Sequence, residues 1–273
     1  MNLTQVREYT RMQPDTKLRS GDQFLSGGTW LFSAPHPEAL RLVDLTDDAA
    51  EPSWEEGSGL ALPAALRLGN LSRWAAASDL EAAGLFVAGI NGLSSSWKII
   101  ERSTVGGNIG LSLAKGAMTP LCLALDGIYE LEGPDEAKRV VSAENFQTGS
   151  MCNVLMPQEY VRRVLIPASA MHQAWALERI TMTAGSHVAT NVIGTWDPST
   201  GQFSLTISAV LTFPVRIDFS TPPADIKSIH DAIDARLQGN DYMDDQHGSA
   251  PYRHAMARYL AERVLAKLSP RWN

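Results

Sequence analysis

Residues 103–110 read Ser-Thr-Val-Gly-Gly-Asn-Ile-Gly, and more of the expected architecture depends on this stretch than on any other. Two adjacent glycines follow a β-branched pair, which predicts a turn whose backbone N–H groups are unpaired and have no Cβ in front of them. A concave row of such amides binds anionic groups. The side chains of Thr104 and Asn108 add donors at the rim. The stretch therefore predicts a phosphate-binding turn, and the competing interpretation is a tight turn without a ligand.

A second glycine pair lies upstream, after a short apolar segment. Phe24-Leu25 predicts a short buried strand, and Ser26-Gly27-Gly28-Thr29 follows it directly. Two amide-rich turns suit a diphosphate with a long group attached. Neither turn fits the G-x-G-x-x-G dinucleotide fingerprint or the G-x-x-x-x-G-K-S/T phosphate loop, so the nucleotide folds built on those loops are disfavoured.

The composition indicates a globular chain with an acidic surface. Its 273 residues are 44% hydrophobic, enough to bury the core of one large domain or two small ones. The 30 acidic and 23 basic side chains give a formal charge of -7, which disfavours a nucleic acid as partner. No stretch approaches the roughly 20 apolar residues of a membrane span, and the N-terminus lacks the apolar core of a secretory signal. We therefore expect a cytoplasmic protein.

The two cysteines, Cys122 and Cys152, predict no metal centre on this chain. They are too few for a disulfide framework, and their spacing could hold neither zinc nor an iron–sulfur cluster. We expect both to be buried structural thiols. Any iron–sulfur cluster that takes part in the chemistry must then lie on another chain.

Apolar patterning in the first half of the chain predicts both strands and helices. A strand is expected at residues 41–45, followed by an exposed acidic connection over 47–59. Helical spacing runs from Leu71 to Ala83, with Gly84 as the stop. Residues 119–131 predict a buried helix that runs into a strand.

The second half predicts an antiparallel sheet and a final helix. The register of the pattern changes around Pro167, and alternating segments at 203–207 and 209–211 indicate antiparallel strands. Residues 249–268 are expected to form the last helix, with Ser249 as its N-cap.

Four motifs in order resemble the FAD-binding medium subunits of molybdenum hydroxylases, the xanthine dehydrogenase and carbon monoxide dehydrogenase family. Those subunits have an Ala-Gly-Gly-Thr turn after a strand and a later Thr-Ile-Gly-Gly-Asn-Ile turn, which residues 25–29 and 104–109 match; residues 60–71 are similar to the strand and turn between them. Residues 163–167 are similar to the Val-x-Ile-Pro strand that opens the family's C-terminal domain. Residues 247–253 are similar to the Gly-Ser-x-x-Tyr-Arg start of its last helix.

The resemblance implies an α+β fold with two domains. Residues 1–158 would form an FAD-binding domain of the vanillyl-alcohol oxidase (PCMH) type, with subdomains at about 1–53 and 54–158. Residues 159–273 would form a C-terminal α+β domain with an antiparallel sheet, and the flavin would lie between it and the subdomains.

The resemblance also implies an oxidoreductase subunit that transfers electrons. FAD on this chain would receive electrons from the 2Fe-2S clusters of a small subunit and pass them to an acceptor such as NAD, oxygen or another carrier. A large subunit would hold molybdopterin and hydroxylate the substrate. The redox chemistry then belongs to the cofactors, and this chain binds, orients and tunes the flavin.

The cofactor-binding residues that the resemblance implies lie in the two glycine turns and shortly after the second. They are Leu25, Ser26, Gly27, Gly28, Thr29, Trp30, Thr104, Gly106, Gly107, Asn108, Ile109 and Thr119. No catalytic residue and no metal ligand is predicted. The chain departs from the family pattern at Ala117, where an acidic residue commonly approaches the ribityl chain, and Thr119 is a possible substitute. It also departs at 98–101, where Lys-Ile-Ile-Glu replaces the usual Gln-Ile-Arg-Asn.

Three local patterns have other interpretations. Ser112 and Lys115 match the S-x-x-K signature of serine acyl enzymes, but no S-D-N or K-T-G companion is present. Residues 241–248, Asp-Tyr-Met-Asp-Asp-Gln-His-Gly, form either a metal-binding loop or a solvated acidic loop. His172 and Trp175 lie where related chains often place an aromatic near the flavin, or they serve only in packing.

Two other functions are compatible with the same fold. One is a stand-alone flavoprotein that oxidises a small molecule itself, for which no convergent acid–base pair is evident. The other is a binding module that has lost FAD.

Overall fold

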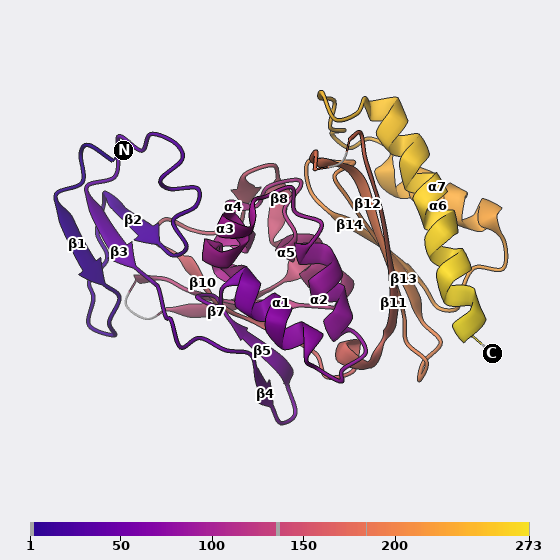
Figure 1. The fold of residues 1–273 in the computed structure, drawn as a ribbon, viewed down its shortest axis with the longest axis horizontal. Helices are drawn as coiled ribbons and strands as arrows, with labels where there is room; N and C mark the ends of the chain where they lie inside the picture. The colour runs from indigo at the N-terminus through magenta and orange to yellow at the C-terminus, as the bar shows by residue number, and fades with distance from the viewer. Residues whose placement is uncertain (1–2, 135–136, 184, 273) are drawn as a thin grey trace.

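The computed structural model describes residues 3–134, 137–183 and 185–272, which form three layers along the long axis of the molecule (Figure 1). A small sheet lies at the N-terminal end, a five-stranded sheet with its helices lies in the middle, and a four-stranded sheet covered by two helices lies at the C-terminal end. The mixed helix and sheet architecture agrees with the predicted α+β class.

The first layer is a parallel sheet of three short strands. Strands β1 (Glu8–Arg11) and β2 (Asp22–Leu25) flank β3 (Arg41–Asp44), and both pair with it in parallel register. The central strand is the most buried because it is covered on both edges, and Val43 is completely inaccessible. The strands predicted at Phe24-Leu25 and at 41–45 are confirmed, although Phe24 and Leu25 are only half-buried.

The middle layer is an antiparallel sheet in the order β4-β5-β10-β6-β7. Its strands are β4 (Ser53–Glu55), β5 (Gly59–Pro63), β6 (Ile128–Glu132), β7 (Lys138–Ser142) and β10 (Tyr160–Ile166). The helices of this layer are α1 (Leu68–Ala76), α2 (Ala83–Ile90), α3 (Trp97–Arg102), α4 (Val105–Leu111) and α5 (Met118–Ala124). A hairpin of β8 (Gln147–Gly149) and β9 (Cys152–Asn153) follows the short 3-10 turn Ala143–Asn145.

Strand β10 lies at the centre of this sheet, because it pairs with β5 along one edge and with β6 along the other. The predicted start of the C-terminal domain at residue 159 directly precedes β10. The next sheet begins only at Ala174, after the 3-10 turn Ala170–His172. The domain division itself stays a prediction.

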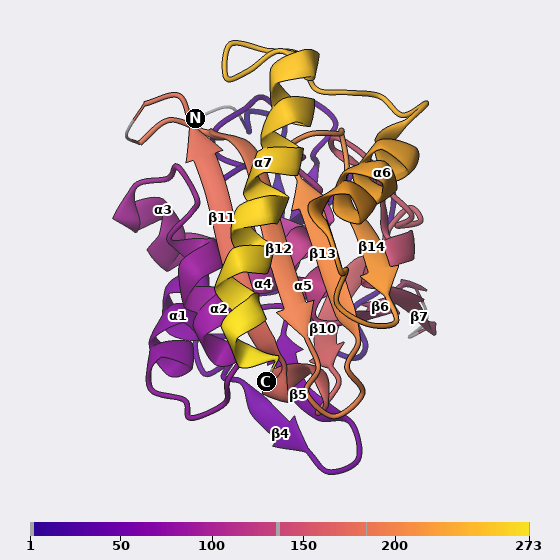
Figure 2. The same ribbon diagram turned by 90° about the vertical axis from the view of Figure 1, so that its right-hand side faces the viewer.

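The third layer is an antiparallel sheet, as predicted, whose strands follow one another in chain order. They are β11 (Ala174–Thr181), β12 (Val188–Trp196), β13 (Phe203–Ser208) and β14 (Val215–Phe219). Helices α6 (Ile226–Leu237) and α7 (Ala250–Leu268) cover one face, as Figure 2 shows, and the 3-10 turn Ser269–Arg271 follows α7. The predicted last helix and its N-cap Ser249, which accepts from the N–H of Tyr252, are confirmed.

Strand β13 shows why both faces of this sheet are buried. Its apolar residues Phe203, Leu205 and Ile207 join the core beneath α6 and α7. The alternate residues are small and polar, and they are also buried because helix α5 packs on the opposite face. On β13 the face toward the middle layer is therefore polar but excluded from solvent, whereas β11 and β12 contribute the apolar Trp175, Leu177 and Ile193 to the core of the middle layer.

Four predictions about local structure are wrong. The helix expected from Leu71 to Ala83 is two helices, α1 and α2, because the chain turns at Ser78, whose hydroxyl accepts from the Leu80 N–H. Gly84 lies inside α2 rather than ending a helix, and a Cβ there would lie 2.8 Å from the Trp175 ring. Cys152 is exposed, whereas Cys122 is buried as predicted.

The fourth is the strand predicted at residues 209–211, which does not form. Ala209 instead has a left-handed backbone with φ of 62°, and only Leu211 makes an isolated bridge, to Tyr242. The chain leaves the sheet at Ala209 because its carbonyl turns toward a buried arginine, described below.

We expect the substitution Gly194→Ala to lower the free energy of unfolding by about 1–3 kcal/mol, as overpacking does in a close-packed core. A Cβ on this β12 residue would overlap Cγ1 of Val264 on α7, and Val264 is fully buried. Urea unfolding measures the change. Gly133→Ala is the matched control because its Cβ would come no nearer than 3.8 Å to any neighbour among the described residues. Equal stability of both variants would contradict this account of helix packing.

Candidate functional site

A cavity of about 1130 Å³ lies where the three layers meet. The first layer contributes strand β2, the glycine turn after it and the segment after β3. The middle layer contributes helix α4, its flanking loops and strand β10, and the third layer contributes His187 and Met243. Because residues from all three layers converge on it, this cavity is the candidate binding site.

The two glycine segments, far apart in sequence, touch each other at the cavity wall. The hydroxyl groups of Ser26 and Thr104 lie 2.7 Å apart, and those of Thr29 and Ser103 lie 3.2 Å apart. Gly27 packs so closely on the carbonyl of Arg102 that a Cβ would overlap it. Glycine is therefore required here for the first layer to dock on the middle one.

The first glycine segment carries the free amides of the site. Gly28 adopts φ of 73°, a left-handed conformation that favours glycine. Within the part of the chain that the structure describes, the backbone N–H groups of residues 27–30 donate no hydrogen bond to other protein groups. Gly27, Thr29 and Trp30 line the cavity. The segment therefore offers a group of unpaired donors at the cavity wall, as the sequence predicted.

The second glycine segment differs from its prediction. Residues 105–111 form helix α4, with Thr104 as N-cap accepting from the Gly107 N–H at 3.1 Å. The N–H groups of Val105 and Gly106 donate to the carbonyls of Leu66 and Ala64. The expectation of several unpaired amides in this segment is therefore wrong, because the middle layer uses them to anchor the helix.

Gly107 is the glycine of α4 that faces open space. A Cβ there would meet only the Thr104 hydroxyl, at 2.9 Å, whereas a Cβ on Gly106 would overlap Ala64. Gly107 also lines the cavity. A larger side chain at this position would extend into the cavity.

The structure brings most of the predicted binding residues to the cavity, but not all of them. Those that line it are Ser26, Gly27, Thr29, Trp30, Thr104, Gly106, Gly107 and Asn108. Leu25, Gly28, Ile109 and Thr119 are not among the lining residues, and the last two are buried. The side-chain oxygen of Asn108 accepts from the Met118 N–H at 2.9 Å, so it holds the α4–α5 connection. The roles of all these residues in cofactor binding stay a prediction.

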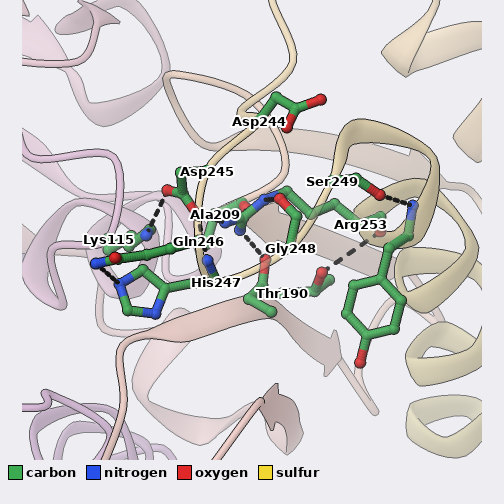
Figure 3. Close-up of polar contacts among 12 residues, drawn as sticks. Lys115, Thr190, Ala209, Asp244, Asp245, Gln246, His247, Gly248, Ser249 and Arg253 are labelled. Atoms are coloured by element: carbon green, nitrogen blue, oxygen red, sulfur yellow. Dashed lines mark hydrogen bonds and ion pairs between the residues drawn. The ribbon is translucent and has the colours of Figure 1, made fainter.

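The polar groups at the C-terminal end of the cavity are not among the binding residues predicted from the sequence. Lys115 and His187 line the cavity there. The ammonium of Lys115 pairs with Asp245 at 2.7 Å, a contact that joins the α4–α5 connection to the loop before α7 (Figure 3). The cluster of charged residues in 241–248 was the only sign in the sequence of this ion pair. No sequence motif indicates that the cluster contacts Lys115.

A buried arginine holds this loop in place. Arg253 of α7 is completely inaccessible, and its guanidinium donates to the carbonyls of Gly248 at 2.9 Å and Ala209 at 2.5 Å, to that of Ala189, and to Asp245 at 2.6 Å (Figure 3). Asp245 thus accepts from two cations at once.

The charges of this cluster shift the pKa values of its members. Burial alone would raise the pKa of Asp245, but the hydrogen bonds from Lys115 and the His247 N–H and the charge of Arg253 lower it to about 2. Burial lowers the pKa of His187, and so do the neighbouring Lys115 and His247. The two imidazole rings meet edge to face, with centroids 5.2 Å apart. At neutral pH the cavity is therefore lined by a neutral His187 beside a charged Lys115.

The geometry does not support the alternative sites. The Ser112 hydroxyl donates to the Ile109 carbonyl at 2.9 Å and accepts from Asn153, while Lys115 pairs with Asp245, so the lysine does not activate the serine. In the described ranges no group of three His, Cys, Asp or Glu side chains could hold a metal ion. His172 is exposed, and Trp175 packs on α2 and donates to the Glu81 carbonyl. Neither of these two residues lines the cavity.

Two curated relatives are medium subunits of oxidoreductases. The chain is 24% identical over 192 residues to the nicotine 6-hydroxylase medium subunit of Paenarthrobacter nicotinovorans, covering 64% of this chain and 63% of that subunit. It is 23% identical over 176 residues to the carbon monoxide dehydrogenase medium chain of Hydrogenophaga pseudoflava, covering 62% and 61%. The match thus spans less than two thirds of either relative. No protein-family model matches the sequence.

Solved structures share the fold over nearly the whole chain. A chain of carbon monoxide dehydrogenase from Hydrogenophaga pseudoflava superimposes with a TM-score of 0.77 at 22% identity, covering 96% of both chains. A chain of quinoline 2-oxidoreductase from Pseudomonas putida 86 gives 0.74 at 19% identity, covering 92% of this chain and 90% of that one. The resemblance to medium subunits of molybdenum hydroxylases is confirmed. No helix among the described residues is long and apolar enough to cross a membrane.

We expect Asp245→Asn to lower the free energy of unfolding at pH 7 by about 2 kcal/mol, because it leaves the buried Arg253 without its counter-charge. Asp245 is itself partly exposed, which keeps the loss below that of a fully buried pair. The folded-state pKa of about 2 lies below the ordinary 3.8, so the stabilisation is present above about pH 4 and lost as the pH falls toward 2.

Urea unfolding of both proteins at pH 7 and pH 3 tests this expectation. Asp244→Asn is the matched control, because its carboxylate makes no ion pair with the described residues. A stability difference that stays constant between the two pH values would contradict the role of the Asp245 charge.

Proposed function

We propose that this chain binds FAD in the cavity and transfers electrons as the medium subunit of a molybdenum hydroxylase. The observation that carries the proposal is the meeting of the two glycine segments at the wall of a cavity of about 1130 Å³, with unpaired amides on one of them. The relatedness to medium subunits of oxidoreductases supports it.

The residues present fit an extended dinucleotide. Ordinary ligand pockets have volumes of about 300–1,000 Å³, so this cavity has room for a longer molecule. The unpaired N–H groups of Gly27, Thr29 and Trp30 would hold the diphosphate, and Gly107 leaves the space that it needs. Apolar residues on either side, among them Leu31, Leu45, Leu93, Leu113 and Val161, would exclude water from the rest of the molecule.

Bound FAD would accept and release the electrons, and the chain would fix the position of the cofactor. The two halves of the site are fixed relative to one another, because Ser26 and Thr29 bond directly to Thr104 and Ser103. The site would therefore hold its cofactor between two segments that are cross-linked by hydrogen bonds.

The proposed partners are those that the resemblance implies, and the relatedness to medium subunits of oxidoreductases supports them. We propose that electrons arrive from 2Fe-2S clusters on a small subunit, that a large subunit holds molybdopterin, and that NAD, oxygen or another carrier accepts the electrons.

We also propose that the first two layers form a two-part FAD-binding domain of the vanillyl-alcohol oxidase type. The sheet at residues 8–44 matches the proposed first subdomain, 1–53. A boundary after β10 rather than at residue 158 would keep the middle sheet whole.

We expect Gly107→Val to abolish FAD retention, because the branched side chain would occupy the cavity beside the diphosphate, and Gly107→Ala to weaken it less. Absorbance of the purified proteins measures FAD per chain, and thermal unfolding shows that each variant is folded. Wild-type occupancy in a folded Gly107→Val variant would refute the site. A wild-type chain that never retains FAD would favour the module that has lost it.

We expect the isolated FAD-loaded chain to be reduced by dithionite but not by the substrate of the whole enzyme, because another polypeptide takes electrons from that substrate. Anaerobic absorbance spectra measure flavin reduction, and electron paramagnetic resonance should show no iron–sulfur signal. Adding the partner subunits should permit reduction by substrate. Reduction of the isolated chain by that substrate would instead identify a stand-alone flavoprotein.

A further inference from the structure

Building on the proposed FAD site, we propose that Lys115 sets the reduction potential of the bound flavin. Its ammonium, fixed by Asp245 at the C-terminal end of the cavity, would favour the reduced, negatively charged ring.

The cluster around Asp245 carries a net positive charge. One carboxylate serves two cations, Arg253 at 2.6 Å and Lys115 at 2.7 Å, so one unit of positive charge is left over. Arg253 is completely buried behind the loop, whereas Lys115 lines the cavity and Asp245 does not. The excess charge therefore acts on the cavity through Lys115.

The lysine is held rather than free. Its side chain is 14% exposed, and the carboxylate that it contacts is anchored by a guanidinium with three further carbonyl partners. A cation with a fixed position in a partly desolvated site interacts more strongly with a nearby charge than a solvated one. His187 beside it is neutral at neutral pH and adds no charge.

The two ends of the cavity differ in charge. The end at the first layer is lined by three carboxylates, those of Asp44, Asp47 and Glu159. Its two cations are engaged elsewhere, because Arg11 donates to the Thr46 carbonyl and Arg162 pairs with Glu130 and Glu132. Carboxylates suit the hydroxyl donors of a ribose. The other end combines Lys115 and His187 with apolar Leu93 and Met243. This end suits a flat ring that gains negative charge, which places the redox-active ring against the third layer.

The chemical step is the reduction of oxidised flavin by two electrons with uptake of one proton, which leaves one negative charge on the ring. The electrons come from the partner's reduced clusters, or from dithionite in the test, and that reductant is oxidised. The proton comes from solvent. Lys115 takes no part in the transfer and acts only by favouring the charged product.

The test compares two variants that break the same ion pair but change the charge in opposite directions. Lys115→Met removes the cation, and we expect it to disfavour the reduced flavin about tenfold, which is a fall of about 30 mV for a two-electron couple. Asp245→Asn removes the anion, and we expect the potential to rise. Lys115→Arg should retain the wild-type potential. Lys138→Met, at an exposed lysine outside the cavity, is the matched control.

Anaerobic titration with dithionite against a reference dye, followed by absorbance, measures each potential. Shifts of the same sign in Lys115→Met and Asp245→Asn would show a structural effect and overturn the proposal, as would an unchanged potential in Lys115→Met. If Lys115→Met loses FAD, the sign of the shift in Asp245→Asn decides. A wild-type chain without FAD would count against the proposed function, whereas bound FAD with unchanged potentials would count only against the role of Lys115.

Discussion

The burial of one guanidinium organises the C-terminal half of the molecule. Arg253 has no access to solvent, so every donor that it presents must find an acceptor within the protein. It finds them in the carbonyls of Ala189, Ala209 and Gly248 and in Asp245. To supply those carbonyls, β13 must end where Ala209 turns, and the loop before α7 must fold back. The position of Asp245, and through it of Lys115 at the cavity, follows from this requirement.

Local signals in the sequence were sufficient for the elements that depend only on neighbours. Ser249 caps its helix as its residue type predicts, and the segment at 119–131 forms α5 and β6. The glycines of the first turn were identified with their unpaired amides, because a left-handed glycine after a strand is a local property. Gly84 was predicted wrongly as a helix stop, because the reason for a glycine there is its close packing against Trp175, which is distant in the sequence.

The cavity could be predicted only in part for the same reason. The two glycine segments were paired through resemblance, and the structure shows that they touch through Ser26 and Thr104. The prediction that the amides of Val105 and Gly106 are free is wrong, because they donate to the carbonyls of Leu66 and Ala64 in the loop between β5 and α1. Lys115 and Asp245 are 130 residues apart, and no sequence motif predicts that they form an ion pair. Alternation in β13 indicated an apolar face correctly, yet α5 buries the polar face as well.

The central place of β10 has a consequence for the order in which the protein can assemble during synthesis. Its hydrogen-bonding neighbours β5 and β6 end at Pro63 and Glu132, whereas β10 itself ends at Ile166. During synthesis, the edges of β5 and β6 that pair with β10 therefore stay without a partner until β10 leaves the ribosome. Pairings of such long sequence separation form slowly and leave edges open to association with other chains. The nascent protein is thus most vulnerable to aggregation just before the strand that joins its halves is made.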